Sequence, residues 1–112
     1  MRNFLIETLE FMRKHRYNES DVLYCTIFRD KHIRFSFDVF KKNANFRYNN
    51  SYGCEEVDST LRIIFKNGYF MERYTYDGAE WWVMKMPLAA DAELYQDDID
   101  LHFQHSDDGE WS

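Results

Sequence analysis

The sequence predicts an α+β domain, in which an N-terminal helix packs on an antiparallel sheet of about five strands. Three observations carry this prediction. Apolar side chains recur every three or four residues near the N-terminus, apolar and polar residues alternate in two later stretches, and Asn-Gly and Asp-Gly dipeptides punctuate the second of these stretches. With 112 residues, four Gly, one Pro and 19% aromatic residues, the chain has the composition of one folded domain with its own core.

The predicted helix runs from about residue 4 to residue 16. Phe4, Leu5, Leu9 and Met12 share one face at helical spacing. Acidic residues lie early and basic residues lie late in this stretch, which complements the helix dipole. The polar run over 18–21 ends the helix.

The stretch over 22–39 is predicted to form a first hairpin with Asp30-Lys31 as a two-residue loop. This register places Phe28 opposite Ile33 and Tyr24 opposite Phe37. The apolar face of the hairpin would then pack against the helix. Its members are Val22, Tyr24, Thr26, Phe28, Ile33, Phe35, Phe37 and Val39. The polar stretch over 41–59 is predicted to be a loop.

Three further strands are predicted over 61–66, 69–76 and 79–86, joined by two tight turns. Asn67-Gly68 and Asp77-Gly78 both suit a type I′ turn, which needs positive φ at its central residues. Pairing about Asp77-Gly78 places Tyr74 opposite Trp81, and Arg73 opposite Trp82 as a cation–π pair. Because Trp81 and Trp82 are adjacent, they point to opposite faces of the sheet, and one of them lies on the face that the helix leaves open.

The charge is unevenly distributed. Residues 1–85 carry 14 Lys and Arg and 12 Asp and Glu, whereas residues 86–112 carry eight acidic residues and no Lys or Arg. We therefore expect a single domain over 1–90 and an acidic segment over 91–112, which is either part of the same domain or mobile. After Pro87 the chain forms a short helix or runs extended with apolar anchors. These anchors are Leu94, Ile99, Leu101 and Phe103.

No signal peptide or membrane span is recognised in the sequence, so we expect a cytoplasmic protein. Two cysteines do not make a disulfide framework. Cys25 lies in an apolar run and is expected to be a small buried side chain, and Cys54 lies in a predicted loop.

The run "YFMERYTYDGAEWW" carries a resemblance to a family of proteins. A bulky pair before Glu-Arg, followed by Tyr-Asp-Gly-x-Glu-Trp-Trp, resembles a hairpin of small accessory proteins of phages and other mobile elements. The matching residues are Tyr69, Phe70, Glu72, Arg73, Tyr76, Asp77, Gly78, Glu80, Trp81 and Trp82. The resemblance covers about a quarter of the chain with its flanks. It implies a mobile-element origin and the cytoplasm of a bacterial host, and it brings no catalytic residues.

The sequence contains no signature of catalysis. It has no Gly-x-Ser-x-Gly elbow and no Gly-rich phosphate loop. His102 and His105 lie three residues apart among acidic residues and are a weak candidate for a metal site, and two solvated histidines explain them as well. We expect no enzyme activity, no cofactor and no metal.

The favoured hypothesis is a protein-binding inhibitor that acts on a host nucleic-acid-handling defence complex, of the anti-CRISPR or anti-restriction type. An array of carboxylates attracts a basic partner and competes for a groove that holds phosphates, as a DNA mimic does. An exposed Trp or an apolar residue of the acidic segment would anchor the complex. The residues predicted to bind the partner are Asp91, Glu93, Tyr95, Asp97, Asp98, Asp100, Trp81 and Trp82.

Other readings stay open. The acidic segment also suits a role in solubility. The stretch over 29–48 interleaves basic and aromatic residues, as single-stranded nucleic-acid-binding proteins do, although the net charge of −6 opposes attraction to phosphate. A structural subunit of a homo-oligomer, with Trp81 or Trp82 buried at its interface, is a third hypothesis.

Overall fold

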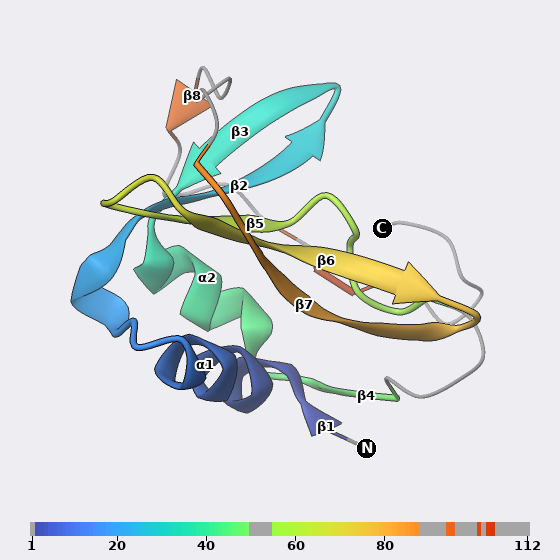
Figure 1. The fold of residues 1–112 in the computed structure, drawn as a ribbon. Helices are drawn as coiled ribbons and strands as arrows, with labels where there is room; N and C mark the ends of the chain where they lie inside the picture. The colour runs from blue at the N-terminus through green and yellow to red at the C-terminus, as the bar shows by residue number, and fades with distance from the viewer. Residues whose placement is uncertain (1, 50–54, 88–93, 96–100, 102, 105–112) are drawn as a thin grey trace.

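A computed structural model of the chain describes residues 2–49, 55–87, 94–95, 101 and 103–104. A six-stranded sheet has both helices on one of its faces (Figure 1). Its strand order is β7-β6-β5-β2-β3-β8. The helices are α1 (Phe4–Lys14) and α2 (Phe37–Ala44), and the sheet strands are β2 (Val22–Arg29), β3 (Lys31–Phe35), β5 (Arg62–Phe65), β6 (Phe70–Tyr76), β7 (Ala79–Lys85) and β8 (Leu94–Tyr95). Five of these strands pair antiparallel, which confirms the predicted α+β class, and β8 adds a parallel pair with β3.

Helix α1 confirms the predicted N-terminal helix. The side chain of Asn3 caps it by accepting the N–H of Ile6 at 2.9 Å. The buried face carries Phe4, Thr8 and Met12, and also Glu7. A buried carboxylate requires partners, and Arg2, Tyr48 and Arg73 supply them for Glu7.

The first hairpin is real, but its predicted register is wrong by one residue. Ile27 pairs with Ile33 and Arg29 with Lys31, and Asp30 alone makes the turn with a φ of 64°. Relative to β3, this shift moves every side chain of β2 to the opposite face of the sheet, so Cys25 and Ile27 take the places predicted for Thr26 and Phe28. The buried residues on the helix side are therefore Cys25, Ile27, Ile33 and Phe35.

The predicted continuation of this hairpin through Phe37 and Val39 is also wrong, because these residues begin α2. Ser36 caps the helix by accepting the N–H of Val39 at 3.2 Å. Phe37, Phe40 and Ala44 then lie on the buried side of α2 at helical spacing. After α2, β4 (Arg47–Tyr48) pairs with β1 (Arg2–Asn3), so the predicted loop over 41–59 contains the end of a helix and a strand.

The β5–β6–β7 meander confirms most of its prediction. Asp77 and Gly78 both have positive φ, at 53° and 85°, and Tyr76 pairs with Ala79 across this two-residue turn. The other turn is not type I′. Only Gly68 has positive φ there, at 94°, and its N–H binds the carbonyl of Phe65 at 2.9 Å, so Lys66 and Asn67 are the central residues of that turn.

Part of the C-terminal segment is built into the core. Leu94 and Tyr95 run extended beside β3, and the side chains of Leu101 and Phe103 are 3% and 1% exposed. The N–H of Asp58 donates to the carbonyl of Phe103 at 2.7 Å, and Val57 forms a β-bridge with Gln104. The extended alternative, with Leu101 and Phe103 as anchors, is therefore the one that the described residues show. Neither helix in the described part of the chain has the length and apolar character that a membrane crossing requires.

Candidate binding surface on the open sheet face

The face of the sheet opposite the helices carries a cluster of exposed aromatic side chains. Tyr74 and Tyr76 on β6 and Trp81 on β7 are 48%, 69% and 37% exposed. Tyr74 and Trp81 are cross-strand partners, and their ring centroids lie 5.2 Å apart. We call these three residues the hairpin patch. Exposed aromatic residues that gather on one rigid element are the usual anchors of a protein interface.

The opposite side of the same hairpin is held firmly in the core. The indole N–H of Trp82 donates to the hydroxyl of Thr8 at 2.9 Å, and its ring stacks on Phe4 at 5.6 Å. The guanidinium of Arg73 lies 4.9 Å from the Trp82 ring, which confirms the predicted cation–π pair. Trp82 is only 3% exposed and in this fold offers almost no surface to a partner, whereas Trp81 is 37% exposed and stays a candidate.

A polar stripe separates the hairpin patch from a second apolar area. Glu72 on β6 lies between Arg62 and Lys85, with N–O distances of 3.4 and 3.6 Å. All three side chains are partly exposed, so these ion pairs contribute little to the stability of the fold. They do supply charges that discriminate between partners.

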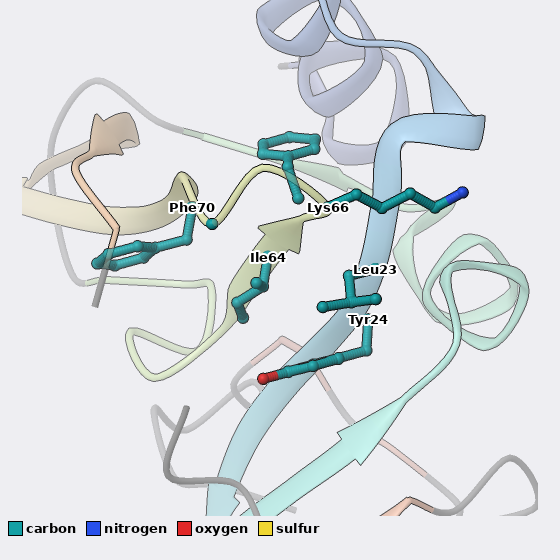
Figure 2. A pocket seen from close by; sticks show the side chains of 7 residues that line it. Leu23, Tyr24, Ile64, Lys66 and Phe70 are labelled. Carbon is teal, nitrogen blue, oxygen red and sulfur yellow. The ribbon is translucent and has the colours of Figure 1, made fainter. Parts of the chain in front are cut away.

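The second apolar area is a shallow hollow beside the β5–β6 turn, with a volume of about 130 Å³. Tyr24, Ile64 and Phe70 line it, and the aliphatic side chain of Leu23 closes one side (Figure 2). Leu23 is 53% exposed although it is aliphatic. The hollow is too small for a typical ligand pocket and has the size of a groove for a side chain of a partner.

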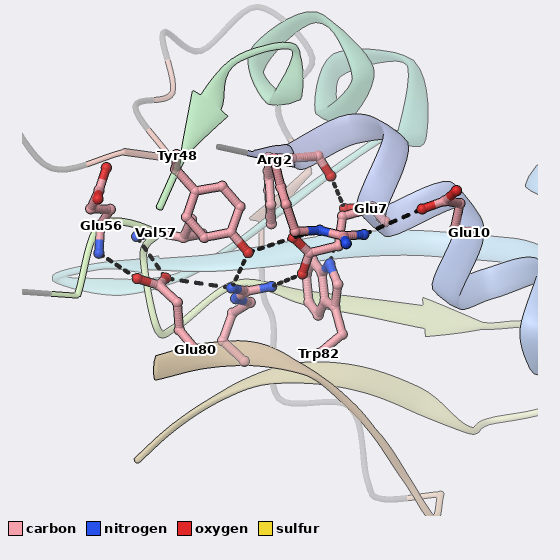
Figure 3. A network of polar contacts seen from close by, with 11 residues as sticks. Arg2, Glu7, Glu10, Tyr48, Glu56, Val57, Glu80 and Trp82 are labelled. Atoms are coloured by element: carbon pink, nitrogen blue, oxygen red, sulfur yellow. Dashed lines mark hydrogen bonds and ion pairs between the residues drawn. The ribbon is translucent and has the colours of Figure 1, made fainter. Parts of the chain in front are cut away.

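On the helix side of the same hairpin lies a buried charge cluster that joins α1, β4, β6 and β7 to the segment at Glu56 and Val57 (Figure 3). The side chain of Arg73 has no exposed surface, and its guanidinium lies 3.0 Å from the hydroxyl of Tyr48, 3.4 Å from Glu80 and 3.6 Å from Glu7. Tyr48 donates to Glu7 at 2.6 Å. The carboxylate of Glu80 accepts the N–H groups of Glu56 and Val57 at 2.7 and 3.0 Å. The cluster is sealed from solvent, so its geometry indicates a structural role.

The pKa values of two members of this cluster, Tyr48 and Glu80, are raised above their ordinary values. Burial raises the pKa of the Tyr48 hydroxyl, which therefore stays protonated and donates to Glu7 at neutral pH. Burial also raises the pKa of Glu80 above its ordinary value of 4.5, against the opposing hydrogen bonds from Glu56 and Val57 and the charge of Arg73.

The raised pKa of Glu80 has a testable consequence for stability. Since the folded state holds this proton more tightly than the unfolded chain, the contribution of Glu80 is greatest below pH 4.5 and is lost as the pH rises through the folded-state pKa. We expect the stability advantage of the wild type over Glu80→Gln to be larger at pH 4 than at pH 7, as measured by urea unfolding. An advantage that grows with pH would contradict this direction.

The predicted acidic residues fall outside the described part of the chain. They are Asp91, Glu93, Asp97, Asp98 and Asp100. The backbone of Tyr95, in β8, pairs with the backbone of Arg34, in β3. Leu101 and Phe103 pack in the core of the protein itself and are therefore excluded as partner anchors.

Most aromatic rings of the stretch over 29–48 are buried, and Phe46 is partly buried. Phe35, Phe40 and Tyr48 have no exposed surface, and Phe37 is 8% exposed. The burial of Phe35 and Phe37 agrees with their predicted place in the core. Single-stranded nucleic acids stack on exposed rings, and the buried rings of this stretch are not accessible for such stacking.

The structure offers little reactive chemistry within its described residues. Cys25 is fully buried, and burial raises the pKa of its thiol well above 9.0, so it is not a thiolate at neutral pH. No group of three His, Cys, Asp or Glu side chains gathers to hold a metal ion among the residues described. His102 and His105 lie outside that part of the chain.

Comparisons with family models, curated proteins and solved structures find no match for this chain. The hairpin patch is the feature that sequence reasoning placed in part, through Trp81. The buried charge cluster was missed. Its signal in the sequence was Glu7, which shares the apolar face of α1 with Phe4.

Proposed function

We propose that this protein is a non-enzymatic binding protein that docks on its partner through the open face of its sheet. The observation that carries the proposal is the hairpin patch of Tyr74, Tyr76 and Trp81. These rings sit on a hairpin that the Arg73–Trp82 contact and the type I′ turn hold in place. A preorganised aromatic surface loses little conformational entropy on binding.

The charge of the chain supports a basic partner. All eight acidic residues beyond residue 85 are unbalanced by any Lys or Arg in that segment. Such a segment speeds association with a basic surface, and contacts made by the hairpin patch slow the dissociation of the complex. With the resemblance of the hairpin to phage accessory proteins, this favours an inhibitor that occludes the nucleic-acid groove of a host defence complex, of the anti-CRISPR or anti-restriction type.

The single-strand alternative is less well supported. Most of its aromatic rings over 29–48 are buried, as described above, and the chain carries a net charge of −6. The proposed inhibitor therefore binds no bare nucleic acid.

The test is inhibition of purified CRISPR effector complexes and restriction enzymes, with the protein added before or after the nucleic acid. Occlusion of a groove predicts inhibition only when the protein is added first. Trp81→Ala is expected to weaken inhibition at least tenfold, because truncation of a central interface Trp costs about 2 kcal/mol or more. Asp97→Asn, Asp98→Asn and Asp100→Asn combined should slow association.

Ile6→Ala provides the matched control. Ile6 is 57% exposed but lies on α1, away from the open face, so its replacement should leave inhibition unchanged. Two results would refute the occlusion mechanism. One is inhibition that is the same whether the protein is added before or after the nucleic acid. The other is binding to bare single-stranded DNA that weakens steeply with salt.

A further inference from the structure

Among the described residues, strand β7 is an end strand of the sheet, and it carries neither a bulge nor a Pro that would protect its edge. Its seven residues pair with β6 without a bulge or a Pro. In the described part of the chain, β6 is the strand with which β7 pairs. Proteins normally shield long edge strands with bulges, prolines or inward charges, because unpaired N–H and C=O groups recruit another strand. Strand β7 has one inward charge, Glu80, and Arg73 and the N–H groups of Glu56 and Val57 already satisfy it, so it does not repel a neighbouring strand. Lys85 is the last residue of the strand.

The tight turn before β7 determines which backbone groups face outward. A two-residue loop is closed by a hydrogen-bonded pair, which here is Tyr76 and Ala79. Hydrogen-bonded and non-hydrogen-bonded pairs then alternate along the antiparallel ladder. The alternation directs the N–H and C=O groups of Glu80, Trp82 and Met84 away from β6, toward the open edge.

We propose that this edge binds the same edge of a second copy of the chain, with the two β7 strands antiparallel and Trp82 on the two-fold axis. Glu80 of each copy then pairs with Met84 of the other through backbone hydrogen bonds. Side chains on the open face meet in complementary pairs, with Trp81 opposite Val83 of the second copy. The dimer continues the sheet from one copy into the other.

Charge complementarity favours a second copy over an unrelated strand. In this register Lys85 lies opposite Ala79 of the other copy and diagonal to its Asp77, which is within reach of a lysine side chain. The side chain of Lys85 is 47% exposed, and Asp77 is exposed at the turn. A two-fold axis produces this Lys–Asp contact twice, so the edge is complementary to itself.

Cysteine cross-linking tests both the dimer and its register, in a Cys54→Ser background. Ala79 and Lys85 form a non-hydrogen-bonded pair across the proposed interface, with Cα atoms about 4.5 Å apart, which suits a disulfide. A mixture of Ala79→Cys and Lys85→Cys chains should therefore give a cross-linked heterodimer under mild oxidation. Ala79→Cys alone and Lys85→Cys alone should stay uncross-linked.

Light scattering of the uncross-linked protein provides the second measurement. The wild type should approach twice the chain mass of 13.7 kDa as its concentration rises. Met84→Pro removes an outward N–H without touching the ladder to β6, so it should stay folded by circular dichroism and lose the dimer. A wild type that stays monomeric at millimolar concentration overturns the proposal, as does cross-linking of Ala79→Cys to itself. Neither result bears on the partner proposed above, which is assayed separately.

Discussion

Replacement of Arg73 by leucine is expected to destabilise the fold by about 3–5 kcal/mol. The change removes the cation between two buried carboxylates, those of Glu7 and Glu80. Glu80 then has no counter-charge, and Glu7 keeps only the half-exposed Arg2, at 3.4 Å. It also removes the guanidinium that lies 5.1 Å from the Phe4 ring. Urea unfolding followed by circular dichroism at pH 7 measures the loss.

Two further variants separate the charge effect from lost packing. Adding Glu80→Gln to Arg73→Leu should recover part of the stability, because the unpaired charge of Glu80 is then gone. Arg62→Leu is the matched control on the open face, where Arg62 and Glu72 are partly exposed, and it should cost less than about 1 kcal/mol. Equal losses for Arg73→Leu and Arg62→Leu would show that the buried cluster contributes nothing special.

Replacement of Phe103 by alanine is expected to cost about 3–5 kcal/mol, although the residue lies only nine positions before the last residue of the sequence. Its ring packs at 5.8 Å from Phe35 and 5.1 Å from Phe40, and it is 1% exposed. The cavity left by the ring cannot collapse easily, because a strand and a helix line it. Thermal and urea unfolding would report the change.

Phe28→Ala makes the same substitution at a site that is 44% exposed, and it should cost about 1 kcal/mol. If Phe103→Ala is no more destabilising than this control, Phe103 is not a core residue.

The burial of Phe103 also affects how the acidic segment is tested. Truncation at Leu88 would remove Leu101 and Phe103 from the core, so neutralising the Asp residues is the cleaner way to test the acidic segment.

The first hairpin shows where local pattern failed. Residues 22–39 contain a period-two alternation that fits two registers, and the loop at Asp30 has one residue in positive φ instead of two in a type I′ turn. Phe35, Phe37 and Val39 continue the alternation into α2, so the pattern alone does not mark the strand end. Ser36, a good helix cap, was the available signal.

The second hairpin shows where local pattern succeeded. Asp77-Gly78 determines a turn whose geometry admits one register, and that register paired Tyr74 with Trp81 and Arg73 with Trp82. Strand alternation then placed the two tryptophans on opposite faces. The sequence pattern did not predict which face of the sheet the helices cover, because this depends on contacts between α1 and β7, which lie more than sixty residues apart in the chain.

The sequence by itself therefore determined the fold class, the N-terminal helix and the meander with its aromatic pairs, since all of these follow from spacing, capping and turn chemistry over a few residues. The tertiary structure alone decided that Trp82 is buried and Trp81 exposed, that Leu101 and Phe103 belong to the core, and that Glu7, Tyr48, Arg73 and Glu80 meet in one buried cluster. These features join residues far apart in the chain. Their free energy arises from burial and from charges brought together, which no local pattern records.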